Sequence, residues 1–130
     1  WLQCSIFNVG GCVMTQVAVI HTAFEDTPRT VAFVDVPEFP TVIETLEYCY
    51  RWTNNIAGSW SKGEILTGDN GETVNNGDYN KNVTVMADLP VYDGKTYGMR
   101  STSVDDQMVI GNQKYVVAGC GFKTIDGKEV

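Results

Sequence analysis

The chain has 130 residues, of which 43% are hydrophobic and 11% aromatic, and its 16 acidic against 9 basic residues give a net charge of -7. A chain of this length is expected to fold as one domain, residues 1–130, burying roughly two thirds of its unfolded surface without a metal or a disulfide. The negative charge repels nucleic-acid phosphates, so the composition argues against a nucleic-acid-binding protein.

The cysteine spacing does not indicate a metal site. The four cysteines lie far apart without a C-x-x-C pair, and the chain has a single histidine, His21. Zinc sites need clustered sulfur and nitrogen ligands, so we expect no metal. No phosphate-binding loop or dinucleotide fingerprint is present, and we expect no cofactor. The pattern favours reduced thiols in a cytoplasmic protein.

Residues 1–24 contain no Asp, Glu, Lys or Arg. Polar residues and glycines interrupt this segment, so it matches neither a signal peptide nor a membrane span. Two interpretations of residues 1–13 remain open. They form an extra strand over residues 5–9 followed by a Gly10-Gly11 turn, or they are a leader that precedes a natural start at Met14. We favour the leader.

Two strands are expected next, over residues 16–24 and 30–36, because both segments are rich in Val, Ile, Thr and Phe. The polar, proline-bearing connector 25–29 is typical of a hairpin loop. His21 falls within the first strand. We interpret it as a histidine on a sheet face rather than a catalytic base, because no serine or cysteine motif accompanies it.

One helix is expected from Thr41 to about Asn54. Thr41 followed by Glu44 is the capping-box pattern, and Gly58 lies beyond the expected end. Residues at helical spacing are expected to face the sheet: Val42, Ile43, Leu46, Cys49, Tyr50 and Thr53. Three further residues lie toward the flank of this stripe: Tyr48, Arg51 and Trp52.

Residues 59–82 are rich in Gly, Asn and Asp and are interpreted as a variable loop insertion. A small exposed hairpin of residues 65–67 and 72–74 is expected around Asn70-Gly71. The runs Asp69-Asn70-Gly71-Glu72 and Asn76-Gly77-Asp78 resemble parts of a calcium loop, but the alternating ligand spacing is missing, so a turn-rich loop is the better interpretation. A third strand follows over residues 83–87, and residues 89–94 are expected to form a turn.

Residues 98–122 hold the polar residues Arg100, Ser101, Thr102 and Ser103, the acidic pair Asp105 and Asp106, and two apolar runs. The runs 107–110 and 114–118 are expected to form a C-terminal hairpin through Gly111-Asn112, because both residues tolerate the positive φ of such turns. Together the elements predict an α+β fold with one main helix packed on a curled antiparallel sheet.

The order of these pieces resembles the small YodL-like proteins and domains of phages, plasmids and other mobile elements, in which an S-x-S-V-G-D stretch precedes a strand pair ending in G-F. The matching stretches here are T-x-x-E-T-L-E-Y-C-Y-R-W-T-N-N from Thr41, N-G-D-Y-N-K-N-V-T-V-M-A from Asn76, R-S-T-S-V-D-D-Q-M-V-I from Arg100 and K-Y-V-V-A-G-C-G-F from Lys114. Asp106 matches the acid of the motif. Asp105 replaces its glycine, and an aspartate tolerates a positive φ there at some cost. The resemblance implies a small intracellular accessory protein of mobile DNA and carries no settled chemistry.

The first functional hypothesis is a non-catalytic protein-binding module whose partner is a host protein or one encoded by the element, with no membrane contact. The expected contact site is an exposed polar loop of Arg100, Ser101, Thr102 and Ser103, because rigid strands can present such a loop; Asp106 and Trp52 join the candidate list. In the structural alternative, the serines and Asp106 simply bond backbone groups in a tight turn.

Two other functions stay open. The first is a small enzyme that uses Asp105 and Asp106 with Arg100 and Ser103, near His21. Adjacent residues at a strand entry point to opposite sides, which weakens the acidic pair as a unit. The second is a weak binder of single-stranded nucleic acid, through stacking aromatic and basic residues: Arg51, Trp52, Trp60 and Lys62.

Overall fold

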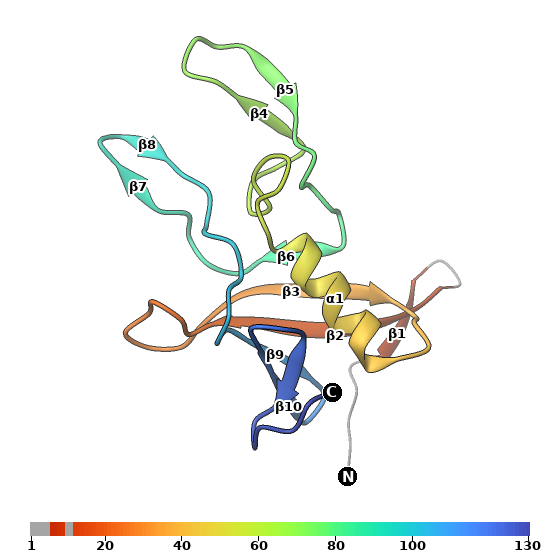
Figure 1. Cartoon of the computed structure of the whole chain (residues 1–130). Coiled ribbons are helices and arrows are strands. Elements are labelled where there is room, and N and C mark those ends of the chain that lie inside the picture. Colours follow the sequence, from red (N-terminus) through yellow and green to blue (C-terminus); the bar gives the residue numbers. More distant parts are fainter. Residues whose placement is uncertain (1–5, 10–11) are drawn as a thin grey trace.

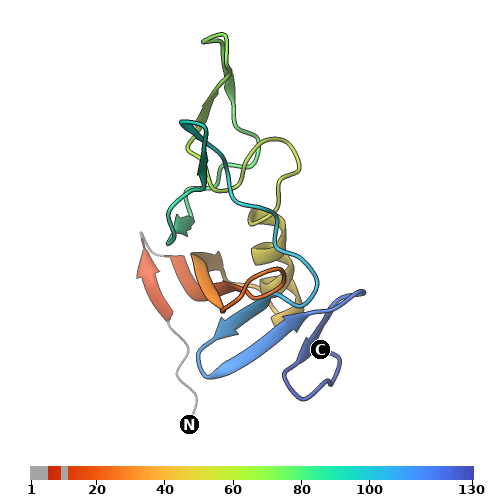
Figure 2. The same cartoon turned by 90° about the vertical axis from the view of Figure 1, so that its left-hand side faces the viewer.

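The computed structural model describes residues 6–9 and 12–130 and has one antiparallel sheet, one helix and two small ribbons in this part of the chain (Figures 1 and 2). This is a small α+β arrangement dominated by its sheet. No helix in the part of the chain that the structure describes has the length and apolar character needed to cross a membrane.

The described strands of the main sheet run in the order β11-β10-β9-β2-β3-β6, and β1 pairs with β2 beside β9. All of these pairs are antiparallel. The long strands β2 and β3 pair at the centre of the sheet. The residues between them form the 22–28 loop. The strands are β1 Ile6–Val9, β2 Cys12–His21, β3 Arg29–Pro37, β6 Val83–Val85, β9 Gln107–Ile110, β10 Gln113–Val117 and β11 Phe122–Thr124.

The helix α1, Val42–Trp52, lies across one face of the sheet (Figure 1). Its start matches the sequence prediction, since the Thr41 hydroxyl accepts the Glu44 N–H at 3.3 Å and donates to the Glu44 carboxylate at 2.8 Å. Leu46 and Cys49 are buried against valines of β2 and β3. Burial raises the pKa of the Cys49 thiol, which therefore behaves as a small hydrophobic group.

The expected helix stripe was too wide. Val42 and Tyr50 are exposed, whereas Leu46, Cys49 and Thr53 are buried. A helix of 11 residues that crosses a sheet buries only the centre of its apolar stripe, so the two outlying positions remain in contact with solvent.

The N-terminal segment contains the strand β1, which agrees with the interpretation of a strand over residues 5–9. Ile6–Val9 pairs with β2 in the register Ile6↔Thr15 to Val9↔Cys12. Ser5 and the expected Gly10-Gly11 turn lie outside the described residues.

Two ribbons project from one end of the sheet, beyond the C-terminal end of α1 (Figures 1 and 2). The first pairs β4, Ile65–Thr67, with β5, Thr73–Asn75, and the second pairs β7, Val91–Tyr92, with β8, Lys95–Thr96. The second ribbon replaces the simple turn expected over residues 89–94.

Candidate functional site

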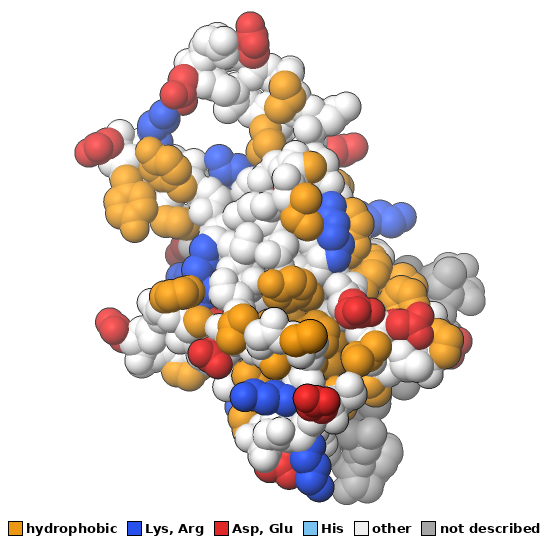
Figure 3. All heavy atoms as spheres, viewed as in Figure 1, with side chains coloured by type: hydrophobic (Ala, Val, Ile, Leu, Met, Phe, Trp, Pro, Cys, Tyr) orange, Lys and Arg blue, Asp and Glu red, His pale blue; other side chains and the backbone are white. Residues whose placement is uncertain are grey.

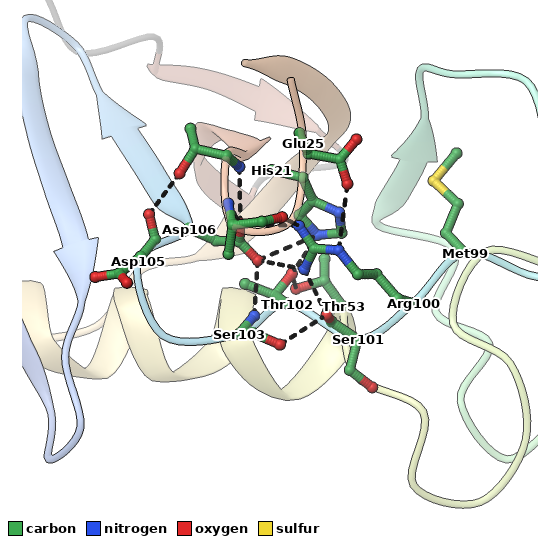
Figure 4. A network of polar contacts seen from close by, with 12 residues as sticks. His21, Glu25, Thr53, Met99, Arg100, Ser101, Thr102, Ser103, Asp105 and Asp106 are labelled. Atoms are coloured by element: carbon green, nitrogen blue, oxygen red, sulfur yellow. Dashed lines mark hydrogen bonds and ion pairs between the residues drawn. The ribbon is translucent and has the colours of Figure 1, made fainter. Parts of the chain in front are cut away.

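A buried carboxylate just before β9 is the centre of the main polar network (Figure 4). Asp106 is fully buried, and the guanidinium of Arg100 donates to both of its oxygens, with Nη1–Oδ2 at 2.6 Å and Nη2–Oδ1 at 3.0 Å. A buried carboxylate needs such a partner because the desolvation of an unpaired charge is strongly unfavourable.

Asp106 also accepts three backbone N–H groups, from Ser103 at 2.7 Å, Thr22 at 2.8 Å and Ala23 at 2.9 Å. Burial alone would raise the pKa of Asp106, but the hydrogen bonds from Arg100 and these backbone groups outweigh it and hold the pKa below its usual value. Asp106 is therefore an anion that ties the start of the 22–28 loop to the segment before β9.

Arg100 binds the same loop from its other side. Its Nη2 donates to the Ala23 carbonyl at 2.5 Å, and its Nε donates to the Glu25 carboxylate at 3.3 Å. The hydrogen bond to Asp106 raises the pKa of Arg100 above its usual value, even though partial burial opposes the charge. Loop residues Thr22, Ala23 and Glu25 are thus held by one ion pair.

A chain of hydrogen bonds runs beneath this ion pair and fixes the state of His21. Thr53 Oγ1 lies 2.8 Å from the Cys49 carbonyl, which can only accept, so Thr53 donates its hydrogen there. Thr102 Oγ1, at 2.8 Å, must then donate to Thr53, and His21 Nε2, at 3.0 Å from Thr102, must donate to Thr102. His21 consequently carries its proton on Nε2, and Nδ1 is a bare acceptor.

His21 is neutral at pH 7. Burial lowers its pKa to about 4, although the nearby Asp106 carboxylate, 3.9 Å from Nε2, opposes the shift. Protonation would place an N–H at the buried Nδ1, which has no hydrogen-bond partner in the described part of the chain. This agrees with the expectation of a structural histidine and leaves Nε2 engaged with Thr102.

The 22–28 loop presents one bulky side chain to solvent. Phe24 is 87% exposed, and its backbone has a φ of 63°, in the left-handed region that bulky residues rarely adopt. The guanidinium carbon of Arg100 lies 5.3 Å from the centre of the Phe24 ring. The sequence reasoning missed Phe24, because nothing in its neighbours signals a positive φ.

The expectation of an exposed polar loop at Arg100, Ser101, Thr102 and Ser103 is wrong. Thr102 is buried and the other three side chains are half-buried. The Ser101 hydroxyl accepts the N–H of Asn55 at 2.8 Å, and the Ser103 hydroxyl donates to the Ser101 carbonyl at 3.3 Å. The hydrogen bonds expected in the structural alternative are therefore confirmed, because the serines and Asp106 bond backbone groups.

The acidic pair does not form a catalytic unit. Asp105 is exposed and has a φ of 80°, whereas Asp106 is buried and bonded through both oxygens. The positive φ at Asp105 is the conformation that a glycine would favour at this position. The two carboxylates therefore lie in different environments, one in contact with solvent and one engaged through both oxygens.

Of the tryptophans that the structure describes, Trp52 and Trp60 suit stacking on nucleic-acid bases poorly. Trp60 was expected to be available for stacking, but it is 2% exposed and its Nε1 donates to the Arg100 carbonyl at 2.9 Å. Trp52 is half-buried, and the guanidinium of Arg51 covers its ring at 4.0 Å. These two rings therefore offer little surface on which a base could stack.

A second acid, Asp78, was expected in a turn-rich loop, and its burial was not predicted. Asp78 is fully buried and accepts the N–H groups of Ile56 and Ala57, while Arg51 Nη1 donates to it at 3.2 Å. The neighbouring Asn76 side chain accepts the Ser59 N–H at 3.0 Å and donates to the Gly63 carbonyl at 2.8 Å. These contacts fasten the 59–82 segment to the end of α1.

Comparison of the chain with protein-family models, with curated proteins and with solved structures finds no match. Among residues 6–9 and 12–130, no three His, Cys, Asp or Glu side chains lie close enough together to hold a metal ion. The function is therefore inferred from the geometry of the site.

Proposed function

We propose that the chain is a non-catalytic protein-binding module that inserts Phe24 into a pocket of its partner. The observation that carries this proposal is the combination of exposure and strain at one residue. Phe24 is 87% exposed with a φ of 63°, in a loop fastened by the ion pair of the half-buried Arg100 with the buried Asp106.

Neither feature stabilises the free protein. A bulky residue in the left-handed region is disfavoured by about 1–2 kcal/mol. The Phe24 ring is 87% exposed, so it gains little from burial beyond its contact with the Arg100 guanidinium. Burial of the ring by a partner is favourable and offsets the backbone strain, because buried aromatic anchors dominate binding energies at protein interfaces. A loop already fixed in its bound conformation also loses less entropy on binding.

The buried network supports this role better than it supports catalysis. Every oxygen of Asp106 is engaged by Arg100 and by backbone N–H groups, and His21 Nε2 donates to Thr102. The one unpaired acceptor of the described network, His21 Nδ1, is fully buried, so a substrate in solution does not reach it. Arg100 and Asp106 act as positioning residues for the 22–28 loop, so the motif at residues 100–106 serves the contact indirectly.

The biological setting is part of the same proposal. The stretch R-S-T-S-V-D-D from Arg100 resembles a motif of YodL-like proteins, which favours an accessory role in a phage, plasmid or other mobile element. We propose a host or element-encoded protein as the partner and the cytoplasm as the location.

The test compares two exposed hydrophobic residues. Phe24→Asn places a residue that tolerates positive φ in the loop, so the melting temperature is expected to stay constant or rise. Co-purification of the partner from cells that naturally express the chain is expected to be lost. The matched control Ile125→Asn changes a residue that is 61% exposed and is expected to keep the partner. Retention of every co-purified protein by a folded Phe24→Asn variant would contradict the proposal.

A further inference from the structure

The two ribbons β4–β5 and β7–β8 form a second feature that the fold itself does not explain. Nearly all of their residues are exposed, and they project away from the sheet (Figure 1). An isolated two-stranded ribbon is marginally stable in water, so such ribbons normally pack against something. Here they contribute none of the main hydrophobic core.

The ribbons are nevertheless held in place relative to each other. Lys95 of β8 forms an ion pair with Asp69 in the β4–β5 turn, with Nζ–Oδ1 at 2.7 Å. Lys62 Nζ donates to the Thr96 carbonyl at 3.2 Å, at the foot of the same pair. The Tyr92 and Tyr97 rings lie 5.8 Å apart at 56° on the second ribbon. Figure 3 shows an opening between the ribbons, which the charged side chains span at their tips.

The exposed surface of the ribbons combines apolar and acidic side chains. Figure 3 shows hydrophobic side chains gathered over β7–β8, with charged side chains at the ends of both ribbons. The exposed hydrophobic residues, with 45% to 66% of their surface accessible, are Ile65, Val74, Val91, Tyr92 and Tyr97. Residues 62–75 and 88–97 carry five acids (Glu64, Asp69, Glu72, Asp88 and Asp93) against two lysines, a net charge of -3.

We infer that the ribbons bind an extended, arginine-rich segment of a partner protein. Guanidinium groups stack on tyrosine faces and pair with carboxylates, so the exposed Tyr92 and Tyr97 rings and the carboxylates of the ribbons suit the arginine side chains of one segment. Apolar residues between the charges accommodate the stems of the arginine side chains. The acidic surface excludes nucleic acid as the occupant, because phosphates would be repelled. This site is separate from Phe24 and does not depend on the function proposed above.

The probe is a fluorescent octapeptide of alternating arginine and proline, titrated with the whole chain and followed by anisotropy. We expect saturable binding that weakens as salt is raised. Tyr92→Ser combined with Tyr97→Ser is expected to weaken binding at least about fivefold, because the stacking faces are lost. Phe24→Asn is expected to leave the affinity unchanged.

Two double variants that remove equal charge distinguish binding of the peptide at the ribbons from general electrostatic attraction of the peptide to an acidic protein. The first double variant, Asp88→Asn with Asp93→Asn, removes two negative charges at the second ribbon. The second, Asp126→Asn with Glu129→Gln, removes two negative charges near the C-terminus, which Figure 1 shows at the opposite end of the molecule. Only the first pair is expected to weaken binding, by about threefold or more. Equal weakening by both pairs, no effect of the tyrosine changes, or no binding of the peptide at millimolar concentration would overturn the inference.

Discussion

Arg100 and Asp106, six positions apart in the chain, form a bidentate ion pair. Together they bond both backbone groups of Ala23. The Ala23 N–H donates to Asp106 while the Ala23 carbonyl accepts from Arg100. A loop that is remote in the sequence is thereby fastened at Ala23, and the same pair also bonds Thr22 and Glu25.

Arg100→Met is expected to lower the free energy of unfolding by about 3 kcal/mol, because it leaves the buried Asp106 carboxylate without its counter-charge. Urea midpoints measure the loss. The matched control Lys95→Met breaks the fully exposed pair with Asp69 and is expected to leave the midpoint unchanged. Similar midpoints for the two variants would mean that the buried pair does not stabilise the fold.

Stability is expected to fall as the pH is lowered from about 6.5 to 4. The pKa of His21 is about 4 in the folded chain, below its ordinary value of 6.5, so the unfolded chain binds more protons in this interval. The stabilisation is complete above pH 6.5, and the loss on reaching pH 4 is on the order of 3 kcal/mol. His21→Gln can still donate to Thr102 but does not titrate, so its melting temperature should vary less over this range. Identical pH profiles for the two proteins would rule out His21 as the cause.

Leu46→Ala is expected to cost about 2–5 kcal/mol, because it removes a large side chain from the centre of the core. Trp52→Ala is expected to cost less, since the ring is half-buried at the flank of the helix. Denaturant midpoints of both variants compare the two positions. Equal losses would show that the buried face of α1 is assigned incorrectly.

Asp105 has a φ of 80° and an exposed side chain. Asp105→Val is expected to lower the free energy of unfolding by about 1–2 kcal/mol, because a β-branched residue fits this backbone poorly. Asp105→Gly is expected to be tolerated, since glycine adopts a positive φ without steric cost. Thermal melts of both variants decide the matter, and a Val variant as stable as the Gly variant would contradict the assigned conformation.

The sequence predicted those parts of the fold that depend on neighbouring residues. Thr41 and Glu44 lie three positions apart, so the helix start could be recognised from the sequence. Alternation along the strand 107–110 places Met108 and Ile110 on the same face, and both are buried. The second ribbon was missed because its strands have only two residues each, too few to show any alternation.

The candidate site depends on contacts between residues far apart in the sequence, which a local sequence pattern does not indicate. Asp106 bonds the N–H of Thr22 across 84 positions, and Thr102 bonds Thr53 across 49. Polar residues beside a hairpin resemble an exposed loop until these distant partners are known. The conformation of Phe24 and the burial of Asp78 were missed for the same reason. The loop at Phe24 is held by Arg100 through the Ala23 carbonyl, and Asp78 is bonded by Ile56, and the fold alone brings these residues together.

The most direct measurement of the proposed contact is covalent capture from position 24. A benzoyl-phenylalanine placed there, in cells that naturally express the chain, is expected to cross-link to one protein on irradiation. The same group at position 125 is expected to give no such product. Adding Arg100→Met to the position-24 variant is expected to weaken the cross-link, because the 22–28 loop loses the ion pair that fastens it. A product from position 125 but not from position 24 would contradict a role for Phe24 in partner binding.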